Sequence, residues 1–194
     1  MRRRCWRALV LVAAQLAHRA SAARPRCRED DILVRNSKGR HTAIDLTGCT
    51  SVNINGFPDV SSDSIFFAHF CEAVASAGPE LREVDISFHR TNPPRGNPIN
   101  DKGIALLADA VMGTNVERLH IGGNVCEADA DAAASLRQLA MKLEYFGSLN
   151  IGVIRRGERP LDLAGAPSVS ECDAVVLGAI IHSEETDIKD INLG

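Results

Sequence analysis

The sequence lacks several features that mark common classes of protein. No apolar run is long enough to cross a membrane as a helix, so we expect no membrane span in the mature chain. The net charge is −3, which gives no indication of nucleic-acid binding. Aromatic residues make up only 4% of the chain, but 45% apolar and 24% charged residues are ordinary values for a folded protein. The 194 residues therefore suit one globular domain with a sizeable core.

The motifs that commonly identify an enzyme or a metal site are also absent. The sequence contains no G-x-S-x-G, no phosphate-binding P-loop and no G-x-G-x-x-G. It contains no C-x-x-C and no H-x-x-x-H, which are spacings typical of zinc ligands. His69, His89 and His120 are expected on different faces of the fold, so they do not form a metal site. We therefore predict a non-catalytic protein with no cofactor and no metal ion.

Residues 1–23 differ in composition from the rest of the chain. A basic start, MRRRCWR, precedes the apolar stretch Ala8–Ala17 and the small residues Ala20–Ala23. This order is typical of a secretory signal peptide, and residues 24–40 would then form an N-terminal flank or cap of the folded domain. A mitochondrial presequence is the alternative, because arginine is frequent and no acidic residue occurs before Glu29. The absence of any N-x-S/T glycosylation sequon is an observation against secretion.

A short pattern of apolar residues is repeated along the rest of the chain. A polar residue stands between two aliphatic ones at Ile44-Asp45-Leu46, Val84-Asp85-Ile86, Leu119-His120-Ile121, Leu161-Asp162-Leu163 and Ile191-Asn192-Leu193. This alternation is typical of a β-strand with one buried face. Because a helix-like segment separates each strand from the next, we expect parallel strands, with the segments around residues 45, 85 and 120 side by side.

Four segments between these strands have the periodicity of amphipathic helices. Each places apolar residues at positions i, i+3, i+4 and i+7, so that four side chains share one helical face. The four sets are Phe67/Phe70/Cys71/Val74, Ile104/Leu107/Ala108/Val111, Leu136/Leu139/Ala140/Leu143 and Ala174/Leu177/Gly178/Ile181. The third position is always small, which would let each helix lie close to its neighbours. Asn100 and Ser170 precede acidic residues and are predicted helix N-caps.

The stretch VERLHIGGNVCEADA is similar to a leucine-rich repeat, with Leu119, Ile121, Asn124 and Cys126 in its L-x-L-x-x-N-x-I positions. The long helices resemble the ribonuclease-inhibitor-like subclass of that family. The resemblance covers residues 41–194 and implies an α/β fold, a right-handed leucine-rich-repeat solenoid of about five irregular repeats. It also implies an inner parallel β-sheet backed by outer helices, and a concave inner face that binds a protein partner.

The resemblance is uneven, because only one repeat has the asparagine and two insertions interrupt the pattern. The insertions are Arg90–Pro98 and Gly147–Pro160. Within the second, Ile151 and Val153 could form the strand of the repeat, or Leu161–Leu163 could form it instead. The chain stops after a strand motif and before a covering helix, and the open end of a solenoid usually carries a cap. This ending favours a solenoid truncated at its C-terminus over one whose end is covered by a partner.

Five cysteines follow the expected leader, so in an oxidising compartment one is unpaired or pairs with another chain. A disulfide between Cys27 and Cys49 would join the first turn, as in capped extracellular leucine-rich repeats. Alternatively, Cys49 is a buried thiol in the asparagine position of its repeat. Cys71 and Cys126 are expected in the core. Cys172, in the first turn of a helix, is the best candidate for an exposed reactive thiol.

The polar residue at the centre of each predicted strand points away from the core, because strand side chains alternate. This column is the candidate partner-binding site. Its members are Asp45, Asp85, His120, Asp162 and Asn192. The aspartates form an acidic strip suited to a basic protein partner, and His120 would make binding depend on pH. Arg82 and Arg118 could offset the repulsion between aspartates, and the alternative is ordinary polar strand surface.

We therefore predict a secreted protein-interaction module of the leucine-rich-repeat type. One alternative is a mitochondrial assembly scaffold with the same fold. The other is the N-terminal recognition part of a larger enzyme or receptor.

Overall fold

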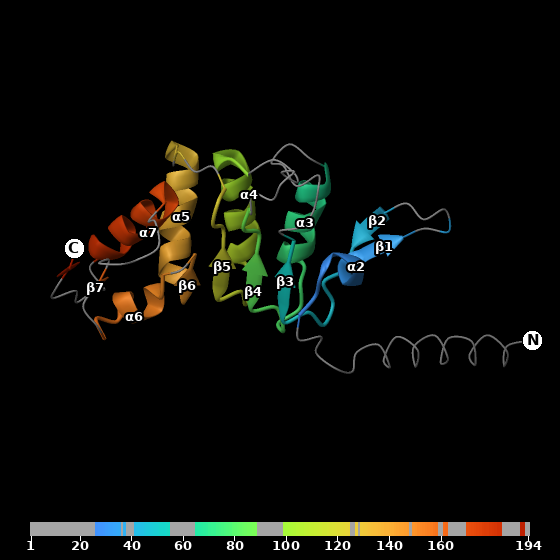
Figure 1. Ribbon diagram of the computed structural model, residues 1–194, viewed down its shortest axis with the longest axis horizontal. Helices are drawn as coiled ribbons and strands as arrows, with labels where there is room; N and C mark the ends of the chain where they lie inside the picture. The colour runs from blue at the N-terminus through green and yellow to red at the C-terminus, as the bar shows by residue number, and fades with distance from the viewer. Residues whose placement is uncertain are drawn as a thin grey trace, which may run out of the picture.

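The computed structural model describes residues 26–35, 37, 41–54, 65–88, 99–124, 127, 129–147, 149–158, 161–162, 170–183 and 191–192. Its helices are α2 (Glu29–Ile32), α3 (Ile65–Ala75), α4 (Asp101–Met112), α5 (Ala130–Lys142), α6 (Ile151–Arg155) and α7 (Glu171–Ile181). Its strands are β1 (Leu33–Arg35), β2 (His41–Ile44), β3 (Ser51–Asn53), β4 (Glu83–Asp85), β5 (Arg118–His120), β6 (Tyr145–Phe146), β7 (Leu161–Asp162) and β8 (Ile191–Asn192). Together they form a mixed α/β fold (Figure 1). The predicted leader, residues 1–23, lies outside the described residues, as do His89 and Cys126.

The centre of the fold is a parallel sheet of four strands in the order β3-β4-β5-β6 (Figure 1). Val52 is in register with Val84, Val84 with Leu119, and Leu119 with Phe146. These four apolar side chains are at most 2% exposed, so they form one continuous buried row. The prediction that the segments around residues 85 and 120 are neighbouring parallel strands is confirmed.

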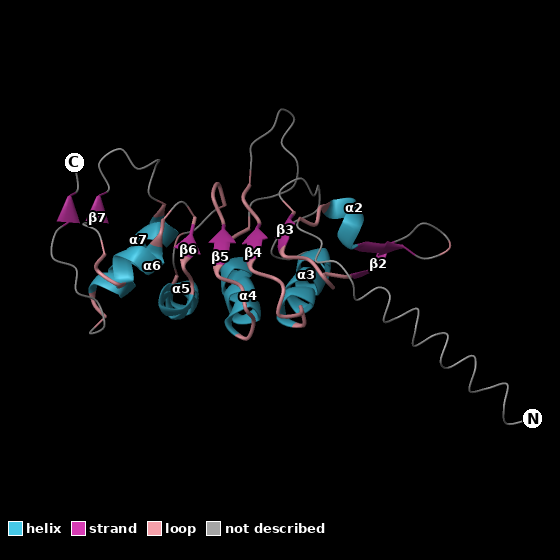
Figure 2. Cartoon of the chain, turned by 90° about the horizontal axis from the view of Figure 1, so that it is seen from below, coloured by secondary structure: helices cyan, strands magenta, loops and turns pink. Residues whose placement is uncertain are grey.

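Helices α3, α4 and α5 lie along one side of this sheet, each between two consecutive strands of the chain (Figure 2). Their predicted apolar faces are buried, which confirms three of the four periodic sets. The buried members are Phe67, Phe70, Cys71, Val74, Ile104, Leu107, Ala108, Val111, Leu136, Leu139, Ala140 and Leu143. In the part of the chain that the structure describes, no helix combines the length and the apolar character that crossing a bilayer requires.

Both predicted N-caps are confirmed. The Asn100 side chain accepts a hydrogen bond from the Gly103 N–H at 3.2 Å. Ser170 Oγ accepts from the Asp173 N–H at 3.1 Å, and the Asp173 carboxylate accepts in return from the Ser170 N–H at 2.9 Å. This reciprocal capping box satisfies two of the N–H groups that a helix start leaves without partners. The first residues of α4 and α7 are therefore set by local sequence.

The predicted apolar face of α7 is wrong. Its buried residues are Cys172, Asp173, Val176, Leu177 and Ile180. Of the predicted set, only Leu177 belongs to this face, and Ile181 is 40% exposed. The reason is that residues 174–181 are all apolar or glycine, so the helical period selects no single face.

The first predicted strand is also wrong, since the segment around Asp45 does not join the four-stranded sheet. β2 ends at Ile44 and pairs antiparallel with β1. The place beside β4 is taken by β3 instead. On the other side of β3, Cys27 forms an isolated parallel bridge to Val52, with its N–H donating to the Ser51 carbonyl at 2.8 Å. The chain before β3 thus covers the edge that the sheet would otherwise expose.

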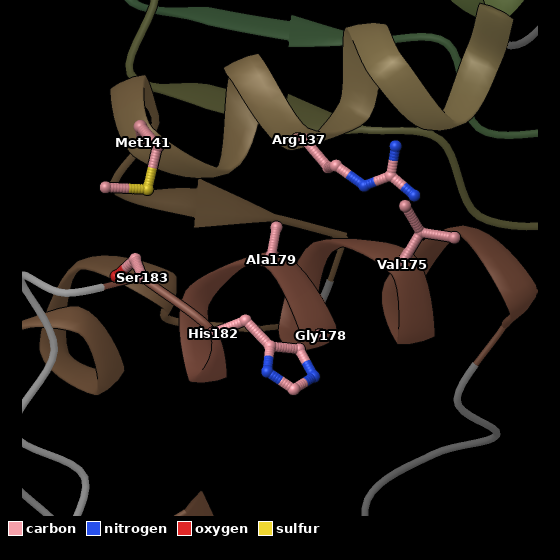
Figure 3. A pocket seen from close by; sticks show the side chains of 7 residues that line it. All are labelled: Arg137, Met141, Val175, Gly178, Ala179, His182 and Ser183. Atoms are coloured by element: carbon pink, nitrogen blue, oxygen red, sulfur yellow. The ribbon is translucent and has the colours of Figure 1, made fainter. Parts of the chain in front are cut away.

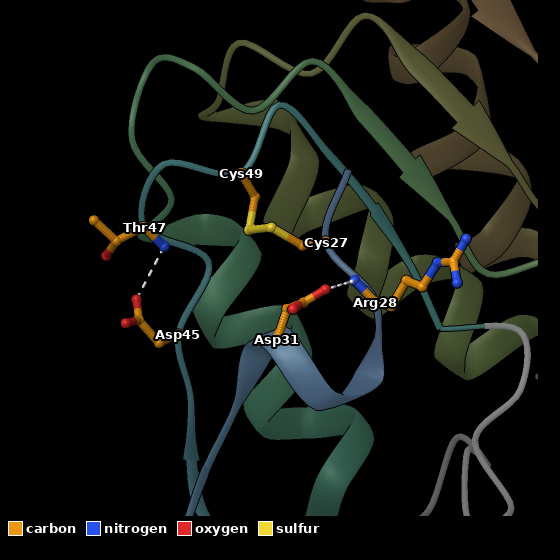
Figure 4. Close-up of a disulfide and its surroundings, with 6 residues drawn as sticks. All are labelled: Cys27, Arg28, Asp31, Asp45, Thr47 and Cys49. Carbon is orange, nitrogen blue, oxygen red and sulfur yellow. Dashed lines mark hydrogen bonds between the residues drawn. A yellow bond between two sulfur atoms is a disulfide. The ribbon is translucent and has the colours of Figure 1, made fainter. Parts of the chain in front are cut away.

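A disulfide joins Cys27 to Cys49, immediately before β3 (Figure 4). Cys172 is 0% exposed and also disulfide-bonded, so the prediction of an exposed reactive thiol at this position is wrong. Among the described cysteines only Cys71 is a free thiol, and burial raises its pKa to about 12. A buried thiol with a raised pKa is a poor nucleophile, so Cys71 is not a reactive site.

Asn124 lies after β5 and bonds its segment to the segment between β4 and α4; these segments belong to two successive turns of the chain. Its Nδ2 donates to the carbonyls of Ile86 at 2.9 Å and Ile121 at 3.0 Å, and its Oδ1 accepts from the Ile99 N–H at 2.8 Å. The preceding Gly123 has φ +77, and an added Cβ would lie 2.0 Å from the Phe88 carbonyl oxygen. Only glycine fits this turn, because the neighbouring backbone fills the space and φ is positive. Asn124 and Gly123 together keep the two turns in register.

The sheet ends at β6, where the chain turns sharply. Phe146 and Leu149 exchange backbone hydrogen bonds of 3.0 and 2.9 Å, and Gly147 between them has φ +56. The next element is helix α6, so the alternative in which Ile151 and Val153 form a strand is wrong. β7 and β8 form a separate parallel pair.

Candidate functional site: the open face of the sheet

The side of the four-stranded sheet opposite helices α3, α4 and α5 is the candidate site, and we call it the open face (Figure 2). Side chains on each strand alternate between the buried row and this face. The open face consists of Ser51, Asn53, Glu83, Asp85, Arg118, His120 and Tyr145. All of them are at least partly exposed. The face therefore offers polar groups at fixed spacings along one plane.

Asp85 lies at the centre of the open face and is held by its neighbours. Asn53 Nδ2 donates to Asp85 Oδ2 at 2.7 Å across the β3–β4 pair. The Ser87 N–H donates to Asp85 Oδ1 at 2.9 Å. Each carboxylate oxygen can accept more than one hydrogen bond, so both retain capacity for a donor from outside. Asp85 is thus a fixed acceptor that a bound partner would not need to order.

His120 is the next residue in this column and contacts both neighbouring strands. Its Nδ1 lies 3.1 Å from the Gly147 carbonyl oxygen. Because a carbonyl only accepts, Nδ1 carries the hydrogen, and Nε2 of the neutral ring has a lone pair. Nε2 lies 3.7 Å from Glu83 Oε1. Protonation of Nε2 would turn this contact into an ion pair and reduce the negative charge of the open face.

Arg118 and Tyr145 form the other end of the open face. The Arg118 guanidinium carbon lies 4.5 Å from the centre of the Tyr145 ring, a cation–π contact. The Tyr145 hydroxyl accepts from Asn150 Nδ2 at 3.0 Å, which fixes the ring. Such a rigid stacked pair provides contact area at low entropic cost.

Charged residues also line the strand starts, one position before the open face. Arg82 forms an ion pair with Glu117. Glu144 pairs with Arg155 at 3.3 Å and with Arg156 at 2.9 Å. Hydrogen bonds from Arg156 to the carboxylates of Glu144 and Glu158 raise the pKa of its guanidinium. Carboxylates here are therefore matched by arginines, whereas Glu83 and Asp85 form no ion pair with an arginine among the described contacts.

The structure places the five predicted binding residues in three separate locations. Asp85 and His120 lie in register on neighbouring strands of the open face. Asp162 and Asn192 lie in register with each other on β7 and β8. Asp45 belongs to neither sheet, and its Oδ1 accepts from the Thr47 N–H at 2.9 Å in a tight turn (Figure 4). The structure therefore does not bring the five residues into one strip, because only Asp85 and His120 share the four-stranded sheet.

Asn53 occupies the position that was predicted for Asp45. The sequence did contain the necessary signal, because Cys49-x-x-Val52-x-Ile54 has the same spacing as Leu81-x-x-Val84-x-Ile86. A cysteine in the first apolar position and the Ile44-Asp45-Leu46 pattern just before it concealed this match. Glu83 and Arg118 occupy a second exposed position just before the aliphatic-polar-aliphatic pattern, and of these two only Arg118 was predicted, as a flanking charge. Tyr145 lies in a strand that the pattern did not predict.

The arrangement can recognise a protein surface, since it combines fixed acceptors, a stacked cation and an imidazole with one donor and one acceptor nitrogen. Among the described residues, no cluster of histidine, cysteine or carboxylate side chains could hold a metal ion. A comparison with protein-family models, curated proteins and solved structures finds no match to this chain.

Proposed function

We propose that this chain is a leucine-rich-repeat protein that binds a protein partner on the open face. The observation that carries the proposal is the row of exposed groups that the strand register brings together, with its central members already held by neighbours. Asp85 is bonded to Asn53, and Arg118 is stacked on Tyr145. A surface ordered before binding loses little side-chain entropy on association.

The repeated backbone pattern supports the family part of this proposal. The Arg82 carbonyl accepts from the N–H groups of both Glu117 and Arg118, and the Glu117 carbonyl accepts from those of Glu144 and Tyr145. Asn124 bonds the carbonyls of two successive turns, the role that an asparagine in this position would serve in a stack of repeats. A right-handed solenoid with a concave open face is the architecture that we infer from these features.

The partner that fits best presents a basic side chain. Glu83 and Asp85 lie on one strand with the same orientation, and neither is neutralised by an arginine among the described ion pairs. A lysine or arginine of the partner would complete the remaining acceptor positions.

A secretory location is part of the proposal. Disulfides persist in oxidising compartments, and Cys27, Cys49 and Cys172 are all disulfide-bonded. Mass spectrometry of the protein from its native cells tests this directly. A mature N-terminus near Ala23 or Arg24 supports secretion, whereas the uncleaved Met1 or a disulfide-free protein contradicts it.

Site-specific photo-crosslinking tests the open face and does not require the partner to be identified first. A crosslinking amino acid at Tyr145 should capture a discrete partner, and one at the exposed Asp109 on α4 serves as the matched control. With the captured protein purified, Glu83→Gln and Asp85→Ala should each weaken binding by about tenfold or more and reduce its dependence on salt. Asp109→Ala should leave the affinity unchanged. Equal capture at both positions, or unchanged affinity of both open-face variants, would refute the proposal.

A further inference from the structure

A groove of about 630 Å³ runs between helices α5 and α7, away from the residues of the open face (Figure 3). Its lining includes Arg137, Met141, Val175, Gly178, Ala179 and His182. The middle of the groove is apolar, and Arg137 and His182 contribute its basic groups. The size and apolar character are those of a site that binds a ligand or a partner segment.

Helix α7 has no polar face, and this is the first reason to expect an occupant. Its buried side faces the core through Val176, Leu177 and Ile180. Its other side presents Val175 and Ala179 to the groove. A helix on the surface of a globular protein normally has a polar outer stripe, and one that is apolar all round is normally covered.

Gly178 gives the second reason. A Cβ added to this residue would have no atom within 4 Å, so packing within the chain does not require a glycine here. The alanines predicted to be equivalent, Ala108 and Ala140, are 1% and 0% exposed and lie in the core. Glycine in the middle of a helix is unfavourable, and its use here leaves the groove floor open to close approach. Small residues at this kind of position let the backbones of two helices come near each other.

The charges of the groove decide between possible occupants. Arg137 and His182 have no ion-pair partner among the described residues, and Glu171, one turn before Val175, is the acidic group on the same side of α7. A second copy of the chain meeting this groove face to face would bring arginine against arginine. An occupant with carboxylates beside an apolar stripe would pair with Arg137 and His182 and would also cover the apolar middle of the groove.

We propose that the groove between α5 and α7 binds an amphipathic helix of a partner protein, which places its apolar face over Gly178 and Ala179. Carboxylates on the flank of that helix pair with Arg137 and His182. This mode is the packing of a helix into an apolar groove, with specificity supplied by the charged rim. The groove is a second binding site, independent of the function proposed for the open face.

The test uses the full folded chain and two synthetic helical peptides followed by fluorescence anisotropy. Both peptides carry leucines at positions i, i+3, i+4 and i+7, and they differ only in flanking glutamates or flanking lysines. The glutamate peptide should bind saturably and the lysine peptide at least about threefold more weakly. Arg137→Glu should reverse this preference, and Asp85→Ala on the open face should change neither affinity.

A variant that fills the groove provides the second arm. Gly178→Leu should weaken binding of the glutamate peptide by at least about tenfold, while the melting temperature stays the same or rises. Three outcomes overturn the proposal: no saturable binding to the unmodified chain, equal affinity for both peptides, or unchanged affinity of Gly178→Leu. A dimer in light scattering that Gly178→Leu converts to a monomer would also overturn it, because the groove would then bind a second copy.

Discussion

The regions before and after Phe146 use similar sequence patterns but build different structures. Before it, β3, β4, β5 and β6 form one sheet in uniform register. After it, the chain turns at Gly147 and enters the short helix α6. The strands that follow, β7 and β8, pair with each other and, among the described residues, with no strand of the larger sheet. The apolar spacing of a strand is therefore not sufficient to extend a sheet.

The difference arises from the backbone segment immediately after each strand. After β4 and β5 the backbone continues to pair, because the Ile86 N–H donates to the His120 carbonyl and the Phe88 N–H to the Gly122 carbonyl. After β6 the carbonyl and N–H of Phe146 are used by Leu149 in a local turn. A strand whose hydrogen-bonding groups are used locally cannot offer them to a further strand.

We expect the largest effect from truncating a side chain of the buried row in the four-stranded sheet, which lies in the region before Phe146. Leu119→Ala removes a side chain that is 2% exposed at the centre of the sheet, and we expect a loss of about 3 to 4 kcal/mol in unfolding free energy. Ile154→Ala in α6, where the side chain is 8% exposed, should cost about 2 kcal/mol. Urea unfolding of both variants measures the difference. Equal losses would show that the region after Phe146 is packed as tightly as the sheet.

Removing the disulfide at the start of the sheet should have the next largest effect. The bond joins residues 22 positions apart, so the double variant Cys27→Ser/Cys49→Ser should lose about 3 kcal/mol. Cys71→Ala is the matched control, because it removes a buried but unpaired thiol and should cost about 1 kcal/mol. Thermal unfolding with and without a reducing agent completes the test. A reductant that leaves the unmodified protein unchanged would mean that the disulfide does not stabilise the sheet.

The smallest expected effect separates two asparagines with different roles. Asn124→Ala removes two hydrogen bonds between successive turns and one within its own turn, and should cost about 2 kcal/mol. Asn150→Ala removes an N-cap of the five-residue helix α6 and a bond to Tyr145, and should cost about 1 kcal/mol. Hydrogen exchange should show loosening around β4 and β5 in the first variant and around α6 in the second. The reverse pattern would contradict the role assigned to Asn124.

Much of the region before Phe146 could be predicted from the sequence. The errors fall where two patterns of apolar residues compete for the same place in the fold. Helices α3, α4 and α5 have one apolar face each, so their periodicity determines which side is buried. In α7 nearly every position is apolar, and packing against α5 and α6 selects the buried side. Near the start of the sheet, two strand-like patterns lie within ten residues of each other, and the first joins β1 instead.

The same competition between local patterns explains which residues of the candidate site were predicted and which were missed. Asp85 and His120 were found because their strands have an unambiguous alternation. Asn53 was missed because Asp45 stands in an equally good local pattern, and strand pairing is a contact between residues far apart in the chain. The Asn53–Asp85 hydrogen bond spans 32 residues, a distance at which sequence periodicity gives no information on register.

By itself the sequence determined the starts of α4 and α7, the inward sides of α3, α4 and α5, and the inward residues of β4 and β5. These follow from side-chain chemistry and the periods 3.6 and 2, which act over a few residues. Only the tertiary structure decided which strand lies beside β4, where the sheet ends, and how Cys27 and Cys49 close its edge. Those choices depend on hydrogen bonds and packing between distant segments, where several local patterns compete for one place.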